Sequence, residues 1–305
     1  MKQQKRVLIT GCGGMLGESM YKVFCEKYQE VKATDIDLNE SWLSYLDVRE
    51  FSQCVKIFDE YKPEIVLHLA ALTDLEYCET NHENSWCTNA LGTENIAFLA
   101  EKYGCTMVYI STAGIFGGEQ EYFTDFDTPN PLSHYAKGKY YGERFVLERV
   151  SKCFVFRPGW MMGGGPRKDK KFINKIYKQI VAGKTELHVV DDKLGTPTYT
   201  LDFANAISKV LETGYYGLYN QVCDGSCSRY DVAVELINIL GLSDKIKITK
   251  VESDYFEKEY FAPRPYSEKL VNLKLNKRGI NYMRDWKICL QEYALQYIED
   301  FKKRQ

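Results

Sequence analysis

The sequence lacks an excess of charge of either sign, and it lacks a long apolar run. Its 305 residues carry 40 Lys and Arg against 42 Asp and Glu, which leaves a formal net charge of −2. This balance excludes the basic surface that nucleic acids and anionic membranes attract, so we expect neither as a partner. No apolar run approaches the roughly 18 residues of a membrane span. The run Val7–Ile9 is too brief for the core of a signal peptide.

Paired cysteine motifs are also missing. The ten cysteines are scattered along the chain, and without an export signal they favour reduced thiols in a cytoplasmic protein. Cys223 and Cys227 form the closest pair, but no second pair completes a zinc site. We therefore expect no metal and interpret Asp224-Gly225-Ser226 as a plain turn.

Short apolar runs alternate with helical patterns in the amino half. The alternation predicts a Rossmann-type, doubly wound α/β fold, because strands that are apolar nearly throughout belong to a parallel sheet covered on both faces. Hydrophobic residues make up 45% of the chain, enough for such a core. The predicted strands are Arg6–Thr10, Val31–Asp35, Ile65–Leu69, Met107–Ser111 and Cys153–Phe156.

The regularity weakens after Arg157-Pro158, where Gly163–Pro166 and the basic run Arg167–Lys171 indicate a loop. This loop is either solvated, or it contacts phosphate or closes over a substrate. Helices are expected near Phe172–Ala182, Leu201–Thr213, Tyr230–Leu240 and Trp286–Lys303. We expect a dinucleotide-binding domain at 1–158 with a return segment near 191–220, a smaller mixed α/β substrate lobe at about 159–190 and 221–283, and a terminal helix at 284–305.

A glycine-rich turn follows the first predicted strand. Gly11, Gly14 and Gly17 form G-x-x-G-x-x-G, and Met15 and Leu16 belong to the same turn. Backbone without side chains can approach a pyrophosphate, whose charge the following helix N-terminus stabilises. A merely tight strand-to-helix connection is the alternative. We predict that this turn binds NADH or NADPH.

Acidic residues follow the next strands. Asp35 ends the second strand, where a carboxylate accepts hydrogen bonds from an adenosine ribose and repels a 2′-phosphate, so NADH is slightly favoured. Asp37 can serve instead, or lie in a solvated turn. Asp47, next to Val48, is placed to meet the adenine amino group, although an ordinary helix cap fits the spacing equally well.

The pair Tyr135 and Lys139 gives the chain its expected chemistry. Four residues apart, they share one helix face, and an ammonium favours the phenolate and lowers the tyrosine pKa. The pair alone also arises by chance on a helix surface. Thr112, at the end of the strand Met107–Ser111, supplies a hydroxyl that can bind a substrate carbonyl oxygen. We predict Thr112, Tyr135 and Lys139 as catalytic residues.

A further apolar run surrounds His68, which we interpret as a buried structural histidine. The small Ala70 and Ala71 after it let the chain pass close to a cofactor. Thr73 and Asn89 are candidate polar contacts to that cofactor, with Asn89 serving equally well to hold a loop.

With these motifs the chain resembles the extended short-chain dehydrogenase/reductases, and within them the dTDP-4-dehydrorhamnose reductase family. Three segments narrow the match. Residues 192–198 are similar to the family's N/D-x-x-G-x-P-T. Arg264-Pro265-Tyr266-Ser267 followed by Leu270 is similar to R-P-x-x-S-x-L, and Arg157-Pro158-Gly159-Trp160 to R-T-x-W.

The resemblance implies reduction of a nucleotide-linked 4-keto-6-deoxy sugar, in the biosynthesis of nucleotide sugars and cell-surface polysaccharides. Tyr135 would protonate the C4 oxygen, Lys139 would hold the nicotinamide ribose, and Thr112 would orient the carbonyl. The implied substrate contacts are Ala113, Trp160, Arg264 and Ser267, with Arg264 pairing with the diphosphate and Trp160 either stacking on the substrate or lying in the core. A homodimer is expected from the fold alone.

One departure concerns the sugar. The family reads S-T-D-Y-V-F where this chain has Ser111-Thr112-Ala113-Gly114-Ile115-Phe116, so an acid and an aromatic are gone. Two other functions fit the same motifs. An epimerase or dehydratase with retained NAD uses the same three catalytic residues as the reductase. A non-catalytic subunit that resembles the regulatory subunit of methionine adenosyltransferase is the other alternative.

Overall fold

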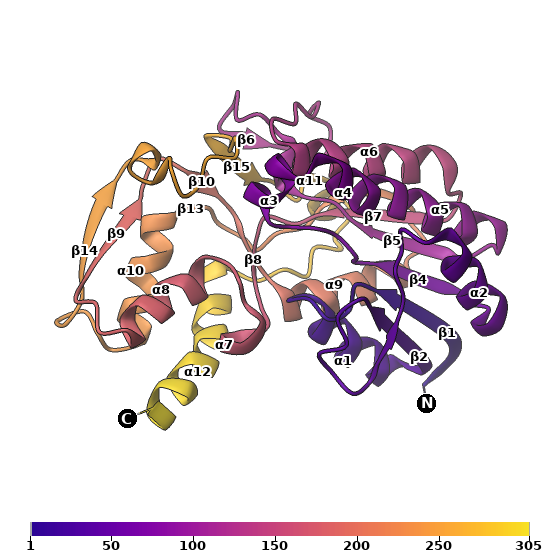
Figure 1. Cartoon of the computed structure of the whole chain (residues 1–305), viewed down its shortest axis with the longest axis horizontal. Coiled ribbons are helices and arrows are strands. Elements are labelled where there is room, and N and C mark those ends of the chain that lie inside the picture. Colours follow the sequence, from indigo (N-terminus) through magenta and orange to yellow (C-terminus); the bar gives the residue numbers. More distant parts are fainter. Residues whose placement is uncertain (1, 305) are drawn as a thin grey trace.

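The computed structural model describes residues 2–304, and its largest element is a seven-stranded parallel sheet (Figure 1). Each strand expected from the sequence is present, with both ends within three residues of the prediction, and the doubly wound fold is confirmed. From edge to edge the strands are β12 (Gly217–Asn220), β7 (Cys153–Arg157), β5 (Thr106–Ile110), β4 (Ile65–His68), β1 (Gln3–Thr10), β2 (Tyr28–Asp35) and β3 (Leu43–Tyr45).

Helices cover both faces of this sheet. One face carries α1 (Gly17–Lys27) and α9 (Thr200–Glu212), and the other carries α2 (Phe51–Tyr61), α5 (Gly92–Lys102) and α6 (His134–Arg149). Successive side chains of a strand point to opposite faces, so Val7 and Ile9 enter the core beneath α1 while Leu8 enters the core beneath α5. Two buried faces explain why these strands are apolar throughout.

The direction of winding reverses between β1 and β4. The chain runs from β1 outward to β2 and β3, then crosses back to build β4, β5, β7 and β12 on the other side. Loops that leave neighbouring strands in opposite directions open a crevice at their carboxyl ends, where such folds bind ligands. The segments after β4 and β5 are α3 (Leu75–Thr80), α4 (His82–Trp86), the π-helix η1 (Cys87–Leu91) and the 3₁₀ turn η2 (Ala113–Ile115).

The second lobe is mixed. Its small sheets have the orders β13-β10-β15-β6, β11-β8 and β14-β9. The elements are β6 (Tyr122–Phe123), β8 (Trp160–Met162), α7 (Gly165–Lys168), α8 (Phe172–Val181), β9 (Glu186–Val190), β10 (Leu194–Gly195), β11 (Pro197–Tyr199), β13 (Cys227–Ser228), α10 (Arg229–Ile239), β14 (Lys247–Val251), η3 (Ser253–Phe256), β15 (Ser267–Leu270) and α11 (Leu273–Lys277).

Two segments cross between the lobes in ways that composition did not indicate. β6, from the amino half, pairs with β15 in the second lobe. In the segment near 191–220, only α9 and β12 return to the large sheet, whereas β10 and β11 join the smaller sheets. Hydrogen bonding between distant strands decides both placements.

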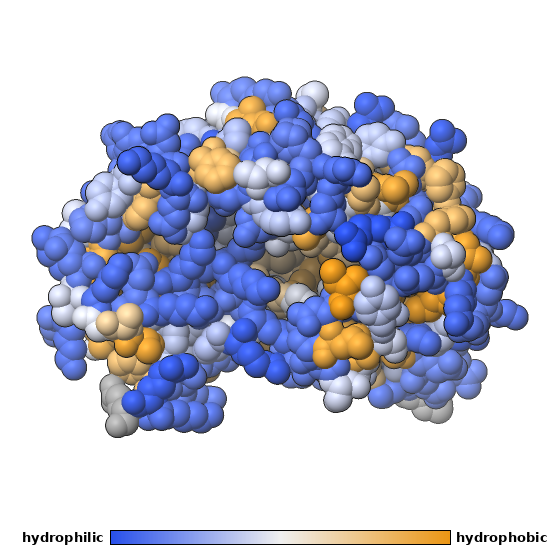
Figure 2. Space-filling model, in the orientation of Figure 1, coloured by the Kyte–Doolittle hydropathy of each residue, from blue (hydrophilic) through white to orange (hydrophobic). Residues whose placement is uncertain are grey.

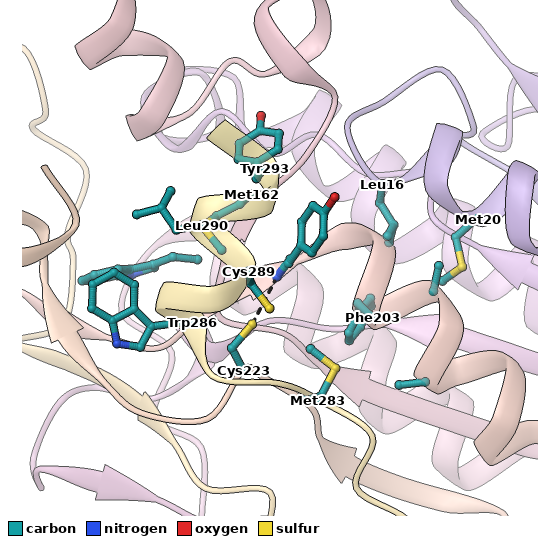
Figure 3. Packing of buried hydrophobic residues seen from close by; sticks show 14 of the residues in the cluster. Leu16, Met20, Met162, Phe203, Cys223, Met283, Trp286, Cys289, Leu290 and Tyr293 are labelled. Atoms are coloured by element: carbon teal, nitrogen blue, oxygen red, sulfur yellow. Dashed lines mark hydrogen bonds between the residues drawn. The ribbon is translucent and has the colours of Figure 1, made fainter. Parts of the chain in front are cut away.

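The last helix, α12 (Trp286–Arg304), packs into the junction of the lobes. Figure 3 shows its Trp286, Cys289, Leu290 and Tyr293 among buried residues that include Met162 of β8 and Phe203 of α9. Among the described residues, no helix is long and apolar enough to span a membrane.

The cysteines of residues 2–304 are free thiols. Cys223 accepts the backbone N–H of Tyr199 at 3.5 Å. Between Cys223 and Cys227 the chain turns at Gly225, whose φ of +82° is the left-handed conformation that favours glycine. The predicted turn is confirmed.

Candidate active site

A cleft of about 1550 Å³ lies between the lobes, at the reversal point of the large sheet. Figure 2 shows this hollow on the face of the molecule, with hydrophilic side chains around much of its mouth. Most residues predicted from the sequence line it; they are Gly11, Gly14, Met15, Leu16, Asp35, Asp47, Val48, Ala70, Ala71, Thr73, Thr112, Tyr135, Lys139, Trp160 and Arg264. Gly17, Asn89, Ala113 and Ser267 are not brought to its wall.

The glycines of the turn have different physical tasks. Gly11 has a φ of +70°, and a Cβ there would lie 2.3 Å from the backbone of Ala70, so the segments that follow β1 and β4 approach each other backbone to backbone. A Cβ on Gly17 would lie 1.9 Å from the carbonyl oxygen of Cys12, so this glycine allows the turn to pack against itself and does not line the cleft. A Cβ on Gly14 meets only the Gly11 oxygen, at 3.8 Å, and projects into open space. The turn therefore leaves room for a pyrophosphate at the start of α1, and the residues present fit a dinucleotide.

Asp35 is held at the edge of this turn by backbone donors. Its two carboxylate oxygens accept the N–H groups of Gly13 at 2.8 Å and of Asp37 at 2.9 Å. The geometry orients the carboxylate and leaves lone pairs for ribose hydroxyls. Asp37 also lines the cleft but is exposed.

Asp47 is engaged by a residue that the sequence did not single out. Arg49 Nε and Nη2 donate to its carboxylate at 2.9 and 2.6 Å, and this guanidinium lowers the pKa of Asp47. The N-cap of α2 is Glu50, so the helix-cap alternative for Asp47 is wrong.

His68 and Asn89 are buried and bind protein groups. His68 Nδ1 lies 2.8 Å from Thr10 Oγ1 and Nε2 lies 3.1 Å from Thr93 Oγ1, while burial lowers the His68 pKa to about 3. The histidine is structural, as the apolar run predicted. Asn89, in η1, binds the backbone N–H and carbonyl of Leu72 at 2.8 and 3.0 Å. It holds the loop after β4, which corrects its assignment as a direct cofactor contact.

Thr112 and Tyr135 meet in the depth of the cleft. Thr112 follows β5 and accepts the N–H of Gly114 at 3.1 Å. Burial raises the pKa of Tyr135 to about 12, and a hydrogen bond with Thr112 opposes that rise. The phenol is therefore a proton donor at neutral pH. The expected lowering of the Tyr135 pKa by Lys139 does not occur here, because burial raises this pKa and the group that opposes the rise is Thr112.

Lys139 is almost fully buried. Its Nζ lies 4.1 Å from the ring centroid of Tyr109, and desolvation lowers the Lys139 pKa to about 7. The Tyr109 hydroxyl donates to the Lys139 carbonyl at 3.0 Å, and a Cβ on Gly142 would lie 2.6 Å from that hydroxyl. Gly142 thus lets α6 approach β5 closely enough to place the lysine. The Glu143 carboxylate opposes this fall in the Lys139 pKa.

The wall opposite the glycine turn centres on Trp160. Its Nε1 donates to Glu268 Oε2 at 2.7 Å, and the Arg229 guanidinium lies 3.6 Å from its ring centroid. A Cβ on Gly195 would lie 2.3 Å from the ring, which explains the glycine in segment 192–198. Trp160 is 9% exposed and lines the cleft, so it is both packed and available to a substrate.

Arg229 and Glu268 also line the cleft and were missed. A signal for Glu268 existed. Counted from Arg264, the spacing R-P-x-x-S-x-L places its serine at position 268, and this chain has Glu268 there and its serine one residue earlier.

Two residues that were predicted to contact the substrate are buried and bind backbone groups instead. Ser267 is fully buried and donates to the Glu121 carbonyl at 2.6 Å, so it fixes β15 instead of facing the cleft. Ala113 is buried too, and its N–H donates to the Pro158 carbonyl at 2.8 Å. Both assignments as substrate contacts are wrong in this structure. Arg264 lines the cleft, where its Nη2 lies 2.7 Å from Glu76 Oε1 of α3 and ties the lobes together.

The basic loop Gly163–Lys171 is not a solvated loop. Lys168 is 8% exposed and pairs with Glu40 at 2.8 Å, and Arg167 binds the same carboxylate. Lys171 Nζ donates to the Thr73 carbonyl at 2.7 Å. Buried Asp169 accepts the hydroxyl of Tyr293 on α12 at 2.8 Å. The loop spans from the second lobe to the dinucleotide lobe.

One group of metal-type ligands lies outside the cleft. Donor atoms of Glu79, His82 and His134 lie within 4.8 Å of one another. The two imidazole rings stack with centroids 3.5 Å apart and planes at 14°. The lone pairs of two stacked rings lie in nearly parallel planes, so the two imidazoles are not arranged to converge on one ion.

Comparisons with known proteins give similarities over nearly the whole chain. A family model described as the RmlD substrate binding domain matches residues 5–298. The spore coat polysaccharide biosynthesis protein SpsK of Bacillus subtilis is 30% identical over 290 residues, 94% of this chain and 96% of that protein. The crystal structure of dTDP-4-dehydrorhamnose reductase from Bacillus anthracis in complex with NADP has a TM-score of 0.87 and 29% identity, covering 96% of this chain and 100% of the other. Methionine adenosyltransferase 2 subunit beta of Xenopus tropicalis is 23% identical over 306 residues, 99% of this chain and 90% of that protein.

Proposed function

From the premise that this chain belongs to the RmlD substrate binding domain family, we propose that it is an NAD(P)H-dependent reductase of a 4-keto-6-deoxy sugar carried on a nucleoside diphosphate. The observation that carries the proposal is the meeting of Thr112, Tyr135 and Lys139 in one cleft with the open Gly14 turn. The relatives named as a dTDP-4-dehydrorhamnose reductase and a spore coat polysaccharide protein support the substrate class.

The chain's own residues supply the proton and the orientation. Reduced nicotinamide, with its pyrophosphate held at the Gly14 turn, would supply the hydride for C4, and Tyr135 donates its phenolic proton to the C4 oxygen, so that the ketone becomes an alcohol. Thr112 donates to the same oxygen and stabilises the charge that develops there. Lys139, in its charged form, favours the tyrosinate left after proton transfer.

Cations from the second lobe suit the diphosphate. Lys171, at the end of the basic loop, and Arg229, at the start of α10, both line the cleft, and burial lowers the pKa of both. A doubly charged diphosphate would offset that desolvation. Arg264 would have to break its ion pair with Glu76 before it could bind the diphosphate.

We propose that NADH is preferred, because the Asp35 carboxylate would face a 2′-phosphate. Binding of both cofactors, followed by quenching of intrinsic fluorescence, tests this preference. Asp35→Ala is expected to tighten NADPH binding relative to NADH, and Asp244→Ala, at an exposed position outside the cleft, is the control. Tighter NADPH binding by the unaltered protein would refute the preference.

We also propose a homodimer through the exposed aromatic face of α4, α5 and α6. Trp86 and Tyr141 contact edge to face with centroids 5.8 Å apart, as do Phe98 and Phe145 at 5.2 Å. Phe98 is 51% exposed. Light scattering should show that Phe98→Glu produces monomers while Phe126→Glu, at an exposed phenylalanine elsewhere, does not.

The free thiols of the described residues support a cytoplasmic location.

The decisive experiment offers the enzyme a panel of nucleotide 4-keto-6-deoxy sugars with reduced nicotinamide and identifies the products by mass spectrometry. Stoichiometric oxidation of the cofactor supports the reductase. Redox-neutral conversion supports the epimerase or dehydratase instead. A folded protein that binds cofactor but converts no sugar, and captures a partner enzyme, would support the regulatory-subunit reading.

A further inference from the structure

The substituted pair Ala113-Gly114 leaves a space next to Thr112 that another strand fills. A Cβ on Gly114 would lie 3.5 Å from Thr112 Oγ1 and 3.3 Å from Glu268 Oε1. Glu268 belongs to β15, in the second lobe. A side chain as large as the aromatic expected at 114 would compete with this carboxylate for the same volume.

One oxygen of Glu268 is occupied and the other faces the cleft. Oε2 accepts the indole N–H of Trp160 at 2.7 Å, which fixes the rotamer of the carboxylate. Within residues 2–304, Oε1 receives no hydrogen bond, and it lies beside Gly114 on the wall of the cleft. The charge of Glu268 also raises the pKa of Tyr135, so the two groups are close enough to interact.

The ligand group that Glu268 can accept follows from charge. Thr112 and Tyr135 direct their hydroxyl donors at the reacting carbonyl oxygen, which becomes negative during reduction. A carboxylate next to that oxygen would repel it. Glu268 Oε1 therefore suits a hydroxyl donor on the adjacent carbon of the sugar, and hydrogen bonds to charged groups discriminate strongly against analogues that lack the partner.

We propose that Glu268 binds the sugar hydroxyl at C3, next to the reacting carbonyl, and so determines which 4-keto sugar is reduced. The inference rests on the proposed function. In it, the acid absent after Thr112 is supplied by β15, and Gly114 provides the space through which it reaches the sugar. Trp160, held between Glu268 and Arg229, forms the adjoining wall.

The test compares two substrates and two enzymes. The substrates are a nucleotide 4-keto-6-deoxyhexose and its 3-deoxy counterpart, and the enzymes are the unaltered protein and Glu268→Gln. The amide keeps the size and one acceptor oxygen but loses the charge. For the hydroxylated sugar, Glu268→Gln should lower kcat/KM by about 10- to 100-fold. For the 3-deoxy sugar, the two enzymes should differ by less than about threefold.

Controls separate binding from folding. Cofactor affinity should be unchanged in Glu268→Gln, because the residue lies on the substrate side. Glu268→Ser, which restores the residue that the family spacing places here, serves if the amide perturbs Trp160. Glu121→Gln removes an exposed carboxylate that pairs with Lys269 at 2.9 Å on the same strand, and it should leave both reactions unchanged.

Two outcomes distinguish the hypotheses. If the unaltered protein reduces neither sugar, the proposed function fails. If it reduces the hydroxylated sugar and the variants lose equal activity on both substrates, the reductase stands and the role of Glu268 is refuted.

Discussion

Lys139→Met should stabilise the protein while abolishing its chemistry, and the gain should depend on pH. The Lys139 pKa is lowered from 10.5 to about 7, because the side chain is only 3% exposed. Between these pH values the unfolded lysine holds a proton that the folded one has released, so the free energy of unfolding rises with pH. At roughly 1.4 kcal/mol per pKa unit, burial of this ammonium costs about 4 kcal/mol at pH 7 and about 1 kcal/mol at pH 10.

Methionine has a similar unbranched shape and no charge to desolvate. It gives up the contact with the Tyr109 ring, worth about 1 kcal/mol. The expected net stabilisation is therefore about 3 kcal/mol at pH 7 and close to zero at pH 10. Urea denaturation of the protein without cofactor, followed by circular dichroism at both pH values, measures it. Lys137→Met, at an exposed position on the same helix, is the control. A pH-independent difference, or a less stable methionine variant at pH 7, would refute the reasoning.

Three further substitutions test other parts of the site. Tyr135→Phe should lower kcat by about 10²- to 10⁴-fold with cofactor binding retained, whereas Tyr140→Phe on the same helix should not; comparable losses in both would remove Tyr135 from its role. Gly11→Ala should lower the unfolding free energy by several kcal/mol more than Gly183→Ala, because both have positive φ but only Gly11 would clash, at 2.3 Å; equal thermal shifts would contradict this packing. Glu40→Gln releases the two cations of the basic loop and should speed hydrogen exchange in residues 163–171; unchanged exchange would mean that the ion pairs do not hold the loop.

The predictable part of the site depends on short-range patterns. The glycine turn, the strand ending at Thr112 and the i, i+4 pair Tyr135 and Lys139 each lie within a few residues of sequence. Strand pairing then brings their ends together, because parallel strands of one sheet place their carboxyl ends at a common edge. For this reason most of the predicted cofactor residues do line the cleft.

The corrections concern residues whose roles depend on distant partners. Asn89 holds Leu72, and Ser267 holds the Glu121 carbonyl, and neither partner is visible in a local motif. The expected lowering of the Tyr135 pKa by Lys139 was also wrong. A spacing of four residues indicates that two side chains share a helix face, but it does not indicate how deeply they are buried. Desolvation, a property of the whole surrounding structure, governs the pKa of both groups.

By itself, the sequence determined the doubly wound sheet, the glycine turn after its first strand and the placement of Tyr135 and Lys139 on one helix face, since hydrophobic period and fixed spacing are local properties of the chain. The tertiary structure alone decided which side chains of the second lobe line the cleft beside Thr112. Trp160 and Glu268 stand 108 residues apart and meet at 2.7 Å. The packing of β8 and β15 against the loop of Gly114 brings the Glu268 carboxylate next to the residues where the family has an acid and an aromatic. Contacts over such a sequence separation depend on how the two lobes fold together.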